Sequence, residues 1–228
     1  WVIVDIFTQY YDINIGKDVL NFLKMCNVNI NVIFPRNSIV AMISHGFLNE
    51  ARNTLKLLHS QLGNVTKNDL IVGIEPSEVL VWRDEAKSLV TDKLPNVLLF
   101  EELLLKLKQL GVLPKFNALN SKVWVYEHCH QKSLTETCNL TKSLGLIPKL
   151  KIEVINGGCC GMAGEFGYKH LKVSESIAHN SLNNYMEKIQ DQDILIVTGS
   201  SCRKQILDVF KTRSIHLPRL FIESIEVV

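Results

Sequence analysis

Short apolar runs recur along the chain, and each has the length of a β-strand rather than of a helix. Such runs, bounded by polar residues, predict strands buried on both faces, as in a parallel sheet. They occupy residues 1–6, 29–34, 69–73, 122–128, 151–156 and 193–198. The stretches between them predict helices, with Gly145 as a stop signal for one. These helices are expected over 15–25 and 133–144, after His45 and after Gly167, with short segments around 100–102 and 220–223.

The pattern repeats when the chain is laid on itself at about half its length, a sign of an internal duplication. Both halves are expected to have the order β-α-β-α-β-α. Alternation of strands and helices predicts an α/β fold of two pseudo-repeated halves, with parallel sheets and Rossmann-like layering. Gly and Pro interrupt the chain at 111–117, which predicts one domain over 1–116 and another over 117–228.

Four cysteines distinguish the second half from the first. Cys129 follows the first predicted strand of that half, Cys159 and Cys160 follow the second, and Cys202 follows the third. The corresponding positions of the first half hold Phe, Thr, Asn, Ser, Glu and Pro instead. If the halves are duplicates, one thiol site is expected, in the second half, and the first half is a scaffold or docking half.

These thiols are expected to converge, because functional groups of open α/β sheets gather beyond the carboxyl ends of the strands. Four thiolates suit either a closed zinc site or an iron–sulfur cluster. The adjacent pair favours a cluster, since neighbouring residues of an extended chain point apart and a single tetrahedral ion needs both on one side. Glycines around the pair allow positive φ and close approach to an inorganic core. They are Gly157, Gly158, Gly161 and Gly164.

Other interpretations of these residues are weaker but remain open. Cysteines are often core residues, and this is expected of Cys26 and of Cys138, placed in mid-helix. The vicinal pair could form a strained disulfide. The glycine-rich loop lacks the spacing of a phosphate loop. His128 or His130 beside Cys129 could form a nucleophilic pair, or could tune or ligate a metal centre.

Bulk composition narrows the class of protein. The chain has 228 residues, 46% hydrophobic and 21% charged, with a net charge of +2, which suggests neither nucleic-acid nor membrane-surface binding. No apolar run is long enough to cross a bilayer. Six cysteines are too few for a secreted disulfide scaffold, so a reducing cytoplasm is expected. The chain begins in a strand without Met, and is expected to be a piece of a longer protein.

Three segments carry a family resemblance: 127–131 (EHCHQ), 157–167 (GGCCGMAGEFG) and 198–205 (TGSSCRKQ). They resemble the cysteine-rich, Cys-Cys-Gly-motif domain of Fe–S oxidoreductases, as in the glycolate oxidase iron–sulfur subunit and heterodisulfide reductase. Segments 5–12, 46–48 and 75–85 of the first half look like the C-terminal region of large bacterial fused oxidases of the FAD-linked D-lactate/D-2-hydroxyglutarate dehydrogenase type.

The resemblance implies an electron-transfer domain of an FAD-linked 2-hydroxyacid dehydrogenase, cytoplasmic or peripheral on the inner membrane. Its partners would be FAD-binding and ferredoxin-like domains of the same protein, and through them a quinone or other acceptor. FAD would lie outside this chain, which alone is not expected to oxidise a substrate. The family often has a Cys-Cys pair in both halves and a Cys-x-x-Cys motif at the last cysteine position. Here the first half has no such pair, and Gly199 stands where the first Cys of the motif that ends at Cys202 would be. A four-ligand site, with a 4Fe–4S cluster or alternatively zinc, is therefore expected.

Two positive residues, Arg203 and Lys204, would supply charge beside the thiolates or lie solvated at a helix start. A rival function is a structural zinc-binding or docking module without redox activity. A thiol–disulfide enzyme is a third interpretation, which requires an exposed cysteine of low pKa.

Overall fold

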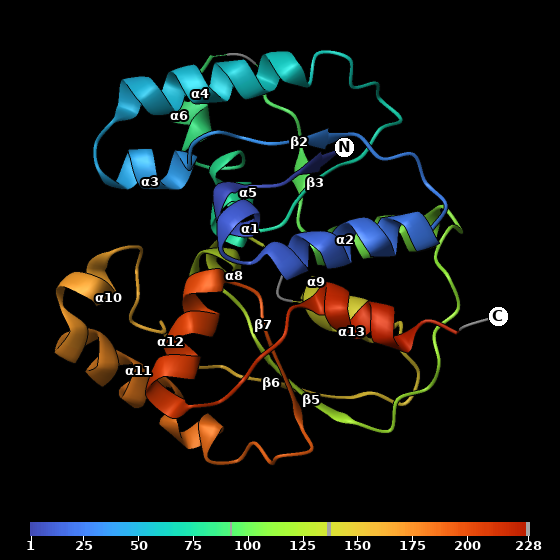
Figure 1. Cartoon of the computed structure of the whole chain (residues 1–228), viewed down its shortest axis with the longest axis vertical. Coiled ribbons are helices and arrows are strands. Elements are labelled where there is room, and N and C mark those ends of the chain that lie inside the picture. The colour runs from blue at the N-terminus through green and yellow to red at the C-terminus, as the bar shows by residue number, and fades with distance from the viewer. Residues whose placement is uncertain (92, 136–137, 227–228) are drawn as a thin grey trace. The chain divides into compact units, whose positions relative to one another are not determined.

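The computed structural model describes residues 1–91, 93–135 and 138–226. The chain forms two compact units, Trp1–Leu113 and Pro114–Val228, called here the first and the second unit. Each has its own parallel sheet and its own helices (Figure 1).

The first unit has a four-stranded parallel sheet in the order β2-β1-β3-β4. Its elements are β1 (Val2–Ile3), α1 (Ile6–Tyr10), α2 (Ile13–Met25), β2 (Val32–Ile33), α3 (Ile39–Ser44), α4 (Leu48–Gln61), β3 (Ile71–Gly73), α5 (Pro76–Val81), α6 (Ala86–Leu89), β4 (Val97–Leu98) and α7 (Phe100–Gln109).

Helices cover both faces of this sheet, because successive strand residues point to opposite sides. Ile3, Ile71 and Val97 pack in one core with buried residues of α3 to α6. Val2 and Val72 face the other way, where α2 and α7 lie. There Phe22 and Phe100 meet edge to face with ring centroids 5.5 Å apart, a geometry worth about 1 kcal/mol beyond area burial.

The second unit has a three-stranded parallel sheet in the order β6-β5-β7. Its elements are β5 (Lys122–Tyr126), α8 (Cys129–Leu134), α9 (Cys138–Leu144), β6 (Lys151–Val154), α10 (Phe166–Lys169), α11 (Leu171–Met186), β7 (Ile194–Val197), α12 (Ser200–Phe210) and α13 (Leu217–Ser224).

Strand alternation also divides the core of the second unit. Trp124 and Tyr126 point to the face covered by α11 and α12, and pack in one cluster with Leu182 of α11 and Ile206 of α12. Val123 and Val125 are buried on the opposite face. The first strand of each unit, β1 or β5, lies between two parallel neighbours, so the two units share the predicted duplicated α/β pattern.

The structure corrects two details of the predicted pattern. The first unit has a further strand, β4, at the start of an apolar run that predicted only a short helical segment, and α7 then continues to Gln109. The single helix expected over 133–144 is instead α8 and α9, and Cys138 is the first described residue of α9. Thr135, in extended conformation, ends α8; residues 136–137 lie outside the described chain.

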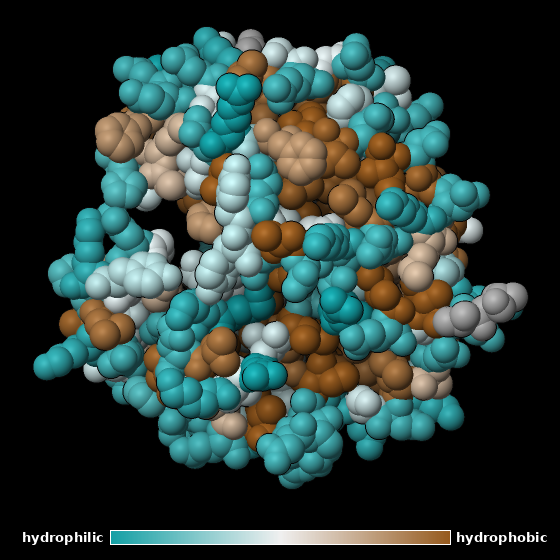
Figure 2. Space-filling view, viewed as in Figure 1, coloured by the Kyte–Doolittle hydropathy of each residue, from teal (hydrophilic) through white to brown (hydrophobic). Residues whose placement is uncertain are grey.

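The surface is mixed in polarity. Figure 2 shows hydrophobic patches between larger hydrophilic areas on the face in view. Large hydrophobic side chains that are exposed include Tyr10, Tyr11 and Phe34. Within the described residues, no helix combines the length and the apolar composition that crossing a bilayer requires.

Candidate metal centre

Three neighbouring strands deliver the four cysteines of the second unit to one edge of its sheet. Cys129 begins α8 after β5, Cys159 and Cys160 lie in the loop after β6, and Cys202 lies in the first turn of α12 after β7. Because β5 pairs with both β6 and β7 in parallel, their carboxyl ends lie side by side. Cys138 begins α9, outside this edge, and Cys26 is a buried residue of the first unit.

The four thiols form a continuous series of sulfur contacts. Cys129 is hydrogen-bonded to Cys159, Cys159 to its neighbour Cys160, and Cys160 to Cys202. Cys160 and Cys202 are buried, whereas Cys129 is exposed to solvent. The site is thus shielded from solvent at Cys160 and Cys202 and accessible to solvent at Cys129.

Cys159 is the thiol that most readily becomes a thiolate. The Cys129 and Cys160 thiols donate to its sulfur, and so does the Gly161 amide at 3.3 Å; these hydrogen bonds lower the pKa of Cys159 to about 2. The same bonds raise the pKa of Cys129 and Cys160, whose protons they hold, and burial raises both further.

The loop that carries the cysteine pair needs glycine at defined points. Gly161 has φ +92°, and a Cβ there would lie 2.3 Å from the Ser174 carbonyl oxygen. A Cβ on Gly157 would lie 2.7 Å from the Ser181 carbonyl oxygen, so this part of the loop packs directly on α11. Gly158 lies against Ser181 as well, whereas Gly164, at φ +64°, has open space around it.

Buried hydrogen bonds fix the elements that carry the thiols. The Gln205 amide of α12 donates to the Ser174 hydroxyl of α11 at 2.9 Å, and Ser174 donates to the Gly161 carbonyl at 2.9 Å. The Thr198 hydroxyl accepts from the His128 amide and donates to the Gln131 side chain, both at 2.9 Å. Buried, fully satisfied networks of this kind hold a single arrangement.

The two candidate histidines and the two candidate cations differ in burial and in hydrogen-bond partners. Burial, then the charges of His130 and Arg203, lower the pKa of His128 to about 4; its buried Nδ1 atom makes no hydrogen bond to any described residue. His130 lies in the first turn of α8, next to Cys129. The Arg203 guanidinium donates to the Val197 and Thr198 carbonyls, each at 2.9 Å, and Lys204 pairs with Asp208.

Two residues that the sequence analysis did not single out lie among the thiols. Tyr126 ends β5, and its hydroxyl donates to the Gly158 carbonyl at 2.6 Å. Burial raises its pKa, and so do the charges of Cys202, Cys160, Cys159 and Cys129, which places the phenol near all four sulfurs. The Lys132 ammonium lies 4.7 Å from the centroid of the Tyr126 ring. One signal was available: Lys132 is three residues after Cys129, on the same side of a helix.

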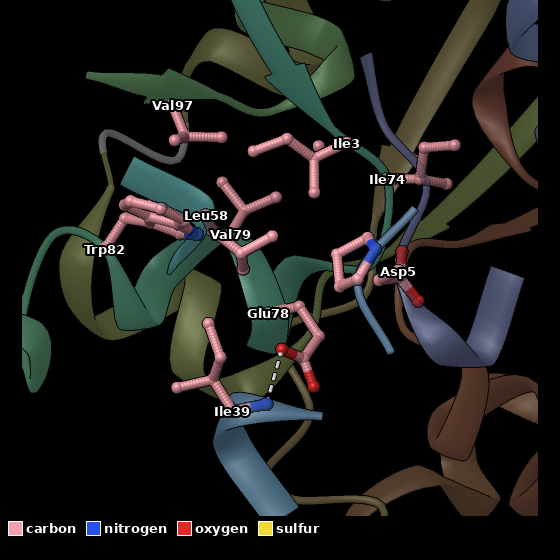
Figure 3. Close-up of a pocket in the computed structure, with 11 residues that line it drawn as sticks. Ile3, Asp5, Ile39, Leu58, Ile74, Glu78, Val79, Trp82 and Val97 are labelled. Atoms are coloured by element: carbon pink, nitrogen blue, oxygen red, sulfur yellow. Dashed lines mark hydrogen bonds between the residues drawn. The ribbon is translucent and has the colours of Figure 1, made fainter. Parts of the chain in front are cut away.

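The corresponding edge of the first unit holds carboxyl groups in place of thiols. Asp5 follows β1 and accepts from the Thr8 hydroxyl at 2.8 Å and from the Glu75 amide at 3.1 Å. Glu78 accepts from the Ile39 amide at 3.2 Å, beside a cavity of ≈ 10 Å³ (Figure 3). The carboxyl oxygens of Asp5 and Glu78 thus accept hydrogen bonds from donors of the same unit.

The donor set of the second unit fits a soft metal centre. Thiolates select zinc or iron–sulfur clusters. A tetrahedral zinc ion with Zn–S bonds of about 2.3 Å would hold its sulfurs about 3.8 Å apart. In the described part of the chain, no three of these sulfur atoms lie within 4.8 Å of one another. That spread fits the several irons of a cluster better than one ion.

The segment that carries the four cysteines matches a known protein family. Residues 123–207 match the cysteine-rich domain family CCG. The match includes Cys129, Cys159, Cys160 and Cys202, and it confirms the resemblance inferred from the sequence.

The similar proteins are longer than this chain. D-2-hydroxyglutarate dehydrogenase of Escherichia coli K12 is 28% identical over 236 residues, which cover 99% of the chain and 22% of that protein. The Haemophilus influenzae protein of the same name is 28% identical over 90% of the chain and 21% of its own length. One subunit of the anaerobic glycerol-3-phosphate dehydrogenase of E. coli K12 is 24% identical over 88% of the chain and 52% of its own length. The chain thus spans about a fifth of the D-2-hydroxyglutarate dehydrogenases and about half of the glycerol-3-phosphate dehydrogenase subunit.

Proposed function

We propose that this chain is an iron–sulfur-binding electron-transfer domain of an FAD-linked 2-hydroxyacid dehydrogenase, of the D-lactate, D-2-hydroxyglutarate or glycolate type. The observation that carries the proposal is the continuous contact of four thiols at one sheet edge. Similarity to dehydrogenases that are longer than the chain supports a role as one part of a larger oxidoreductase.

Each residue of the site would have a distinct role. Cys129, Cys159, Cys160 and Cys202 would hold a 4Fe–4S cluster, which supplies one-electron transfer when bound. The Gly161 amide would stabilise the Cys159 thiolate, as it does in the structure. Exposure of Cys129 leaves a side from which an electron donor or acceptor can approach.

The remainder of the pathway belongs to the same proposal. A flavin outside this chain would take the hydride from the substrate, and ferredoxin-like centres would pass electrons toward a quinone or another acceptor. The protein would work in the cytoplasm or at the periphery of the inner membrane. The relatives named as dehydrogenases support this assignment.

The test is metal and acid-labile sulfide content after anaerobic purification, with a visible spectrum of the same sample. We expect iron and sulfide in comparable amounts and a broad absorbance band. Cys159→Ser should lose all three while its far-ultraviolet circular dichroism stays unchanged. Cys138→Ser, a thiol of the same unit outside the site, is the control and should keep them.

Two outcomes reject the proposal. Stoichiometric zinc without colour would identify the structural or docking module instead. Absence of both metals, from chain that is folded and reconstituted with iron and sulfide, would leave the thiols without a metal function.

A further inference from the structure

Tyr126 and Lys132 form a clamp on the residues that immediately precede the cysteine pair. The Tyr126 hydroxyl donates to the Gly158 carbonyl at 2.6 Å, and the Lys132 ammonium donates to the Gly157 carbonyl at 3.1 Å and the Ile155 carbonyl at 3.4 Å. The ammonium also lies over the Tyr126 ring. Side chains of β5 and α8, the elements that deliver Cys129, thus hold three carbonyls of this loop, at Ile155, Gly157 and Gly158.

The surroundings of Lys132 act on its charge in opposite directions, with burial the largest effect. Burial lowers the pKa of Lys132, while the charges of Glu127, Cys202 and Cys129 raise it. A partly buried ammonium is stable only where carbonyls, a ring face or anions replace water. Two carbonyls and the Tyr126 ring provide that replacement here.

We propose that Lys132 is a positioning residue for the cysteine-pair loop and the cation that offsets the negative charge of the thiol site. The inference rests on the proposed function for the second of these roles. The sequence had indicated Arg203 and Lys204 for the charge. The Arg203 guanidinium bonds the carbonyls at the end of β7, whereas Lys132 bonds the carbonyls of the loop that carries the cysteine pair. The Lys132 ammonium bonds the Gly157 carbonyl, two residues before Cys159, and Lys132 lies about one helical turn after Cys129 on α8, so its charge is held beside the thiol site.

A fixed cation beside a cluster has a measurable electrostatic effect. Reduction adds one negative charge to the site, and a nearby positive charge stabilises the reduced form more than the oxidised form. Lys132 should therefore raise the reduction potential. Removal of the charge should make the potential more negative without a change in the ligand set.

The experiment compares four proteins after anaerobic reconstitution: wild type, Lys132→Met, Lys132→Arg and Lys151→Met. Lys151 is an exposed lysine at the start of β6, at the other end of the same sheet, and serves as the control. Potentiometric titration should give a more negative potential for Lys132→Met, near wild-type values for Lys132→Arg, and no shift for Lys151→Met. Iron and sulfide content measured on each sample shows whether the cluster itself is intact.

Hydrogen exchange of the metal-free proteins tests the positioning role separately. Loss of the Gly157 hydrogen bond should speed amide exchange across residues 155–162 about tenfold in Lys132→Met, and leave it unchanged in Lys151→Met. This readout does not require a cluster. If wild type binds no iron, the proposed function fails, while the exchange comparison still decides the positioning role.

An unchanged potential in Lys132→Met at full iron content would overturn the charge role. Unchanged exchange across residues 155–162 would overturn the positioning role. A shift that Lys132→Arg fails to restore would show that shape, rather than charge, sets the potential.

Discussion

Glu78 shows how burial changes the behaviour of a single side chain. Burial, opposed by hydrogen bonds from Ser38 and Ile39 and reinforced by the charges of Asp5 and Glu75, raises the pKa of Glu78 to about 7. The folded first unit therefore keeps a proton that the unfolded chain, with its ordinary carboxyl pKa, has lost. The stabilisation is complete below about pH 4.5 and is lost as the pH rises through 7.

Glu78→Gln should remove this pH dependence. The free energy of unfolding of the wild type should fall by at most about 3 kcal/mol from pH 4.5 to 8 on account of Glu78. The glutamine, neutral at both values, should flatten that slope and stabilise the chain at pH 8. Urea unfolding at several pH values measures this, with the exposed Glu50→Gln as control; equal slopes in both variants would contradict the prediction.

The two loop glycines make a matched pair of substitutions. Gly161→Ala combines a positive φ with a Cβ 2.3 Å from a backbone oxygen, whereas Gly164→Ala meets only the backbone strain. The strain alone costs about 1–2 kcal/mol, so Gly164→Ala should lower stability by that amount and keep the site. Gly161→Ala should cost more and reduce iron content, as thermal unfolding and metal analysis would show. Equal effects would mean that the loop can move away from Ser174.

Helix α11 acts on the site as an element, although it contributes no cysteine. Ser174 on α11 links Gln205 of α12 to the Gly161 carbonyl, so one hydroxyl connects two of the segments that carry thiols. The position of the cysteine pair therefore depends on how α11 packs on the sheet.

Ser174→Ala should destabilise the second unit by about 1–3 kcal/mol, because the buried Gln205 amide and Gly161 carbonyl each lose a partner. Ser176→Ala is the control: its hydroxyl is exposed and bonds the Lys172 carbonyl of the same helix. Chemical unfolding of both variants measures the cost. A Ser174→Ala variant as stable as Ser176→Ala would show that the link is dispensable.

At the scale of the whole molecule, each unit has its own sheet and its own apolar core. The second unit is thus expected to fold without the first and to keep the four thiols together. Residues 114–228 alone should unfold cooperatively on heating and should bind iron and sulfide as the whole chain does. An unfolded product, or one that binds neither, would show that the first unit is needed for the site.

Local patterns of apolar and polar residues predicted most of the helices and strands, because the signals for buried strands and helix ends depend on residues that are neighbours in the sequence. They missed β4, since a two-residue strand followed at once by α7 cannot be separated from one apolar run. They also merged α8 and α9, because no Gly or Pro interrupts 133–144 and the extended conformation of Thr135 has no local signal.

The sequence by itself determined the duplicated α/β pattern, the glycines of the loop and which four cysteines follow the strands of the second half. Those features depend on periodicity and on residue types at fixed spacing. Tertiary structure decided the order of the sulfur contacts and the low pKa of Cys159. It also decided the presence of Tyr126 and Lys132 among the thiols and the engagement of Arg203 by backbone carbonyls. Each of these depends on distances and burial set by strand pairing and helix packing between residues far apart in the chain.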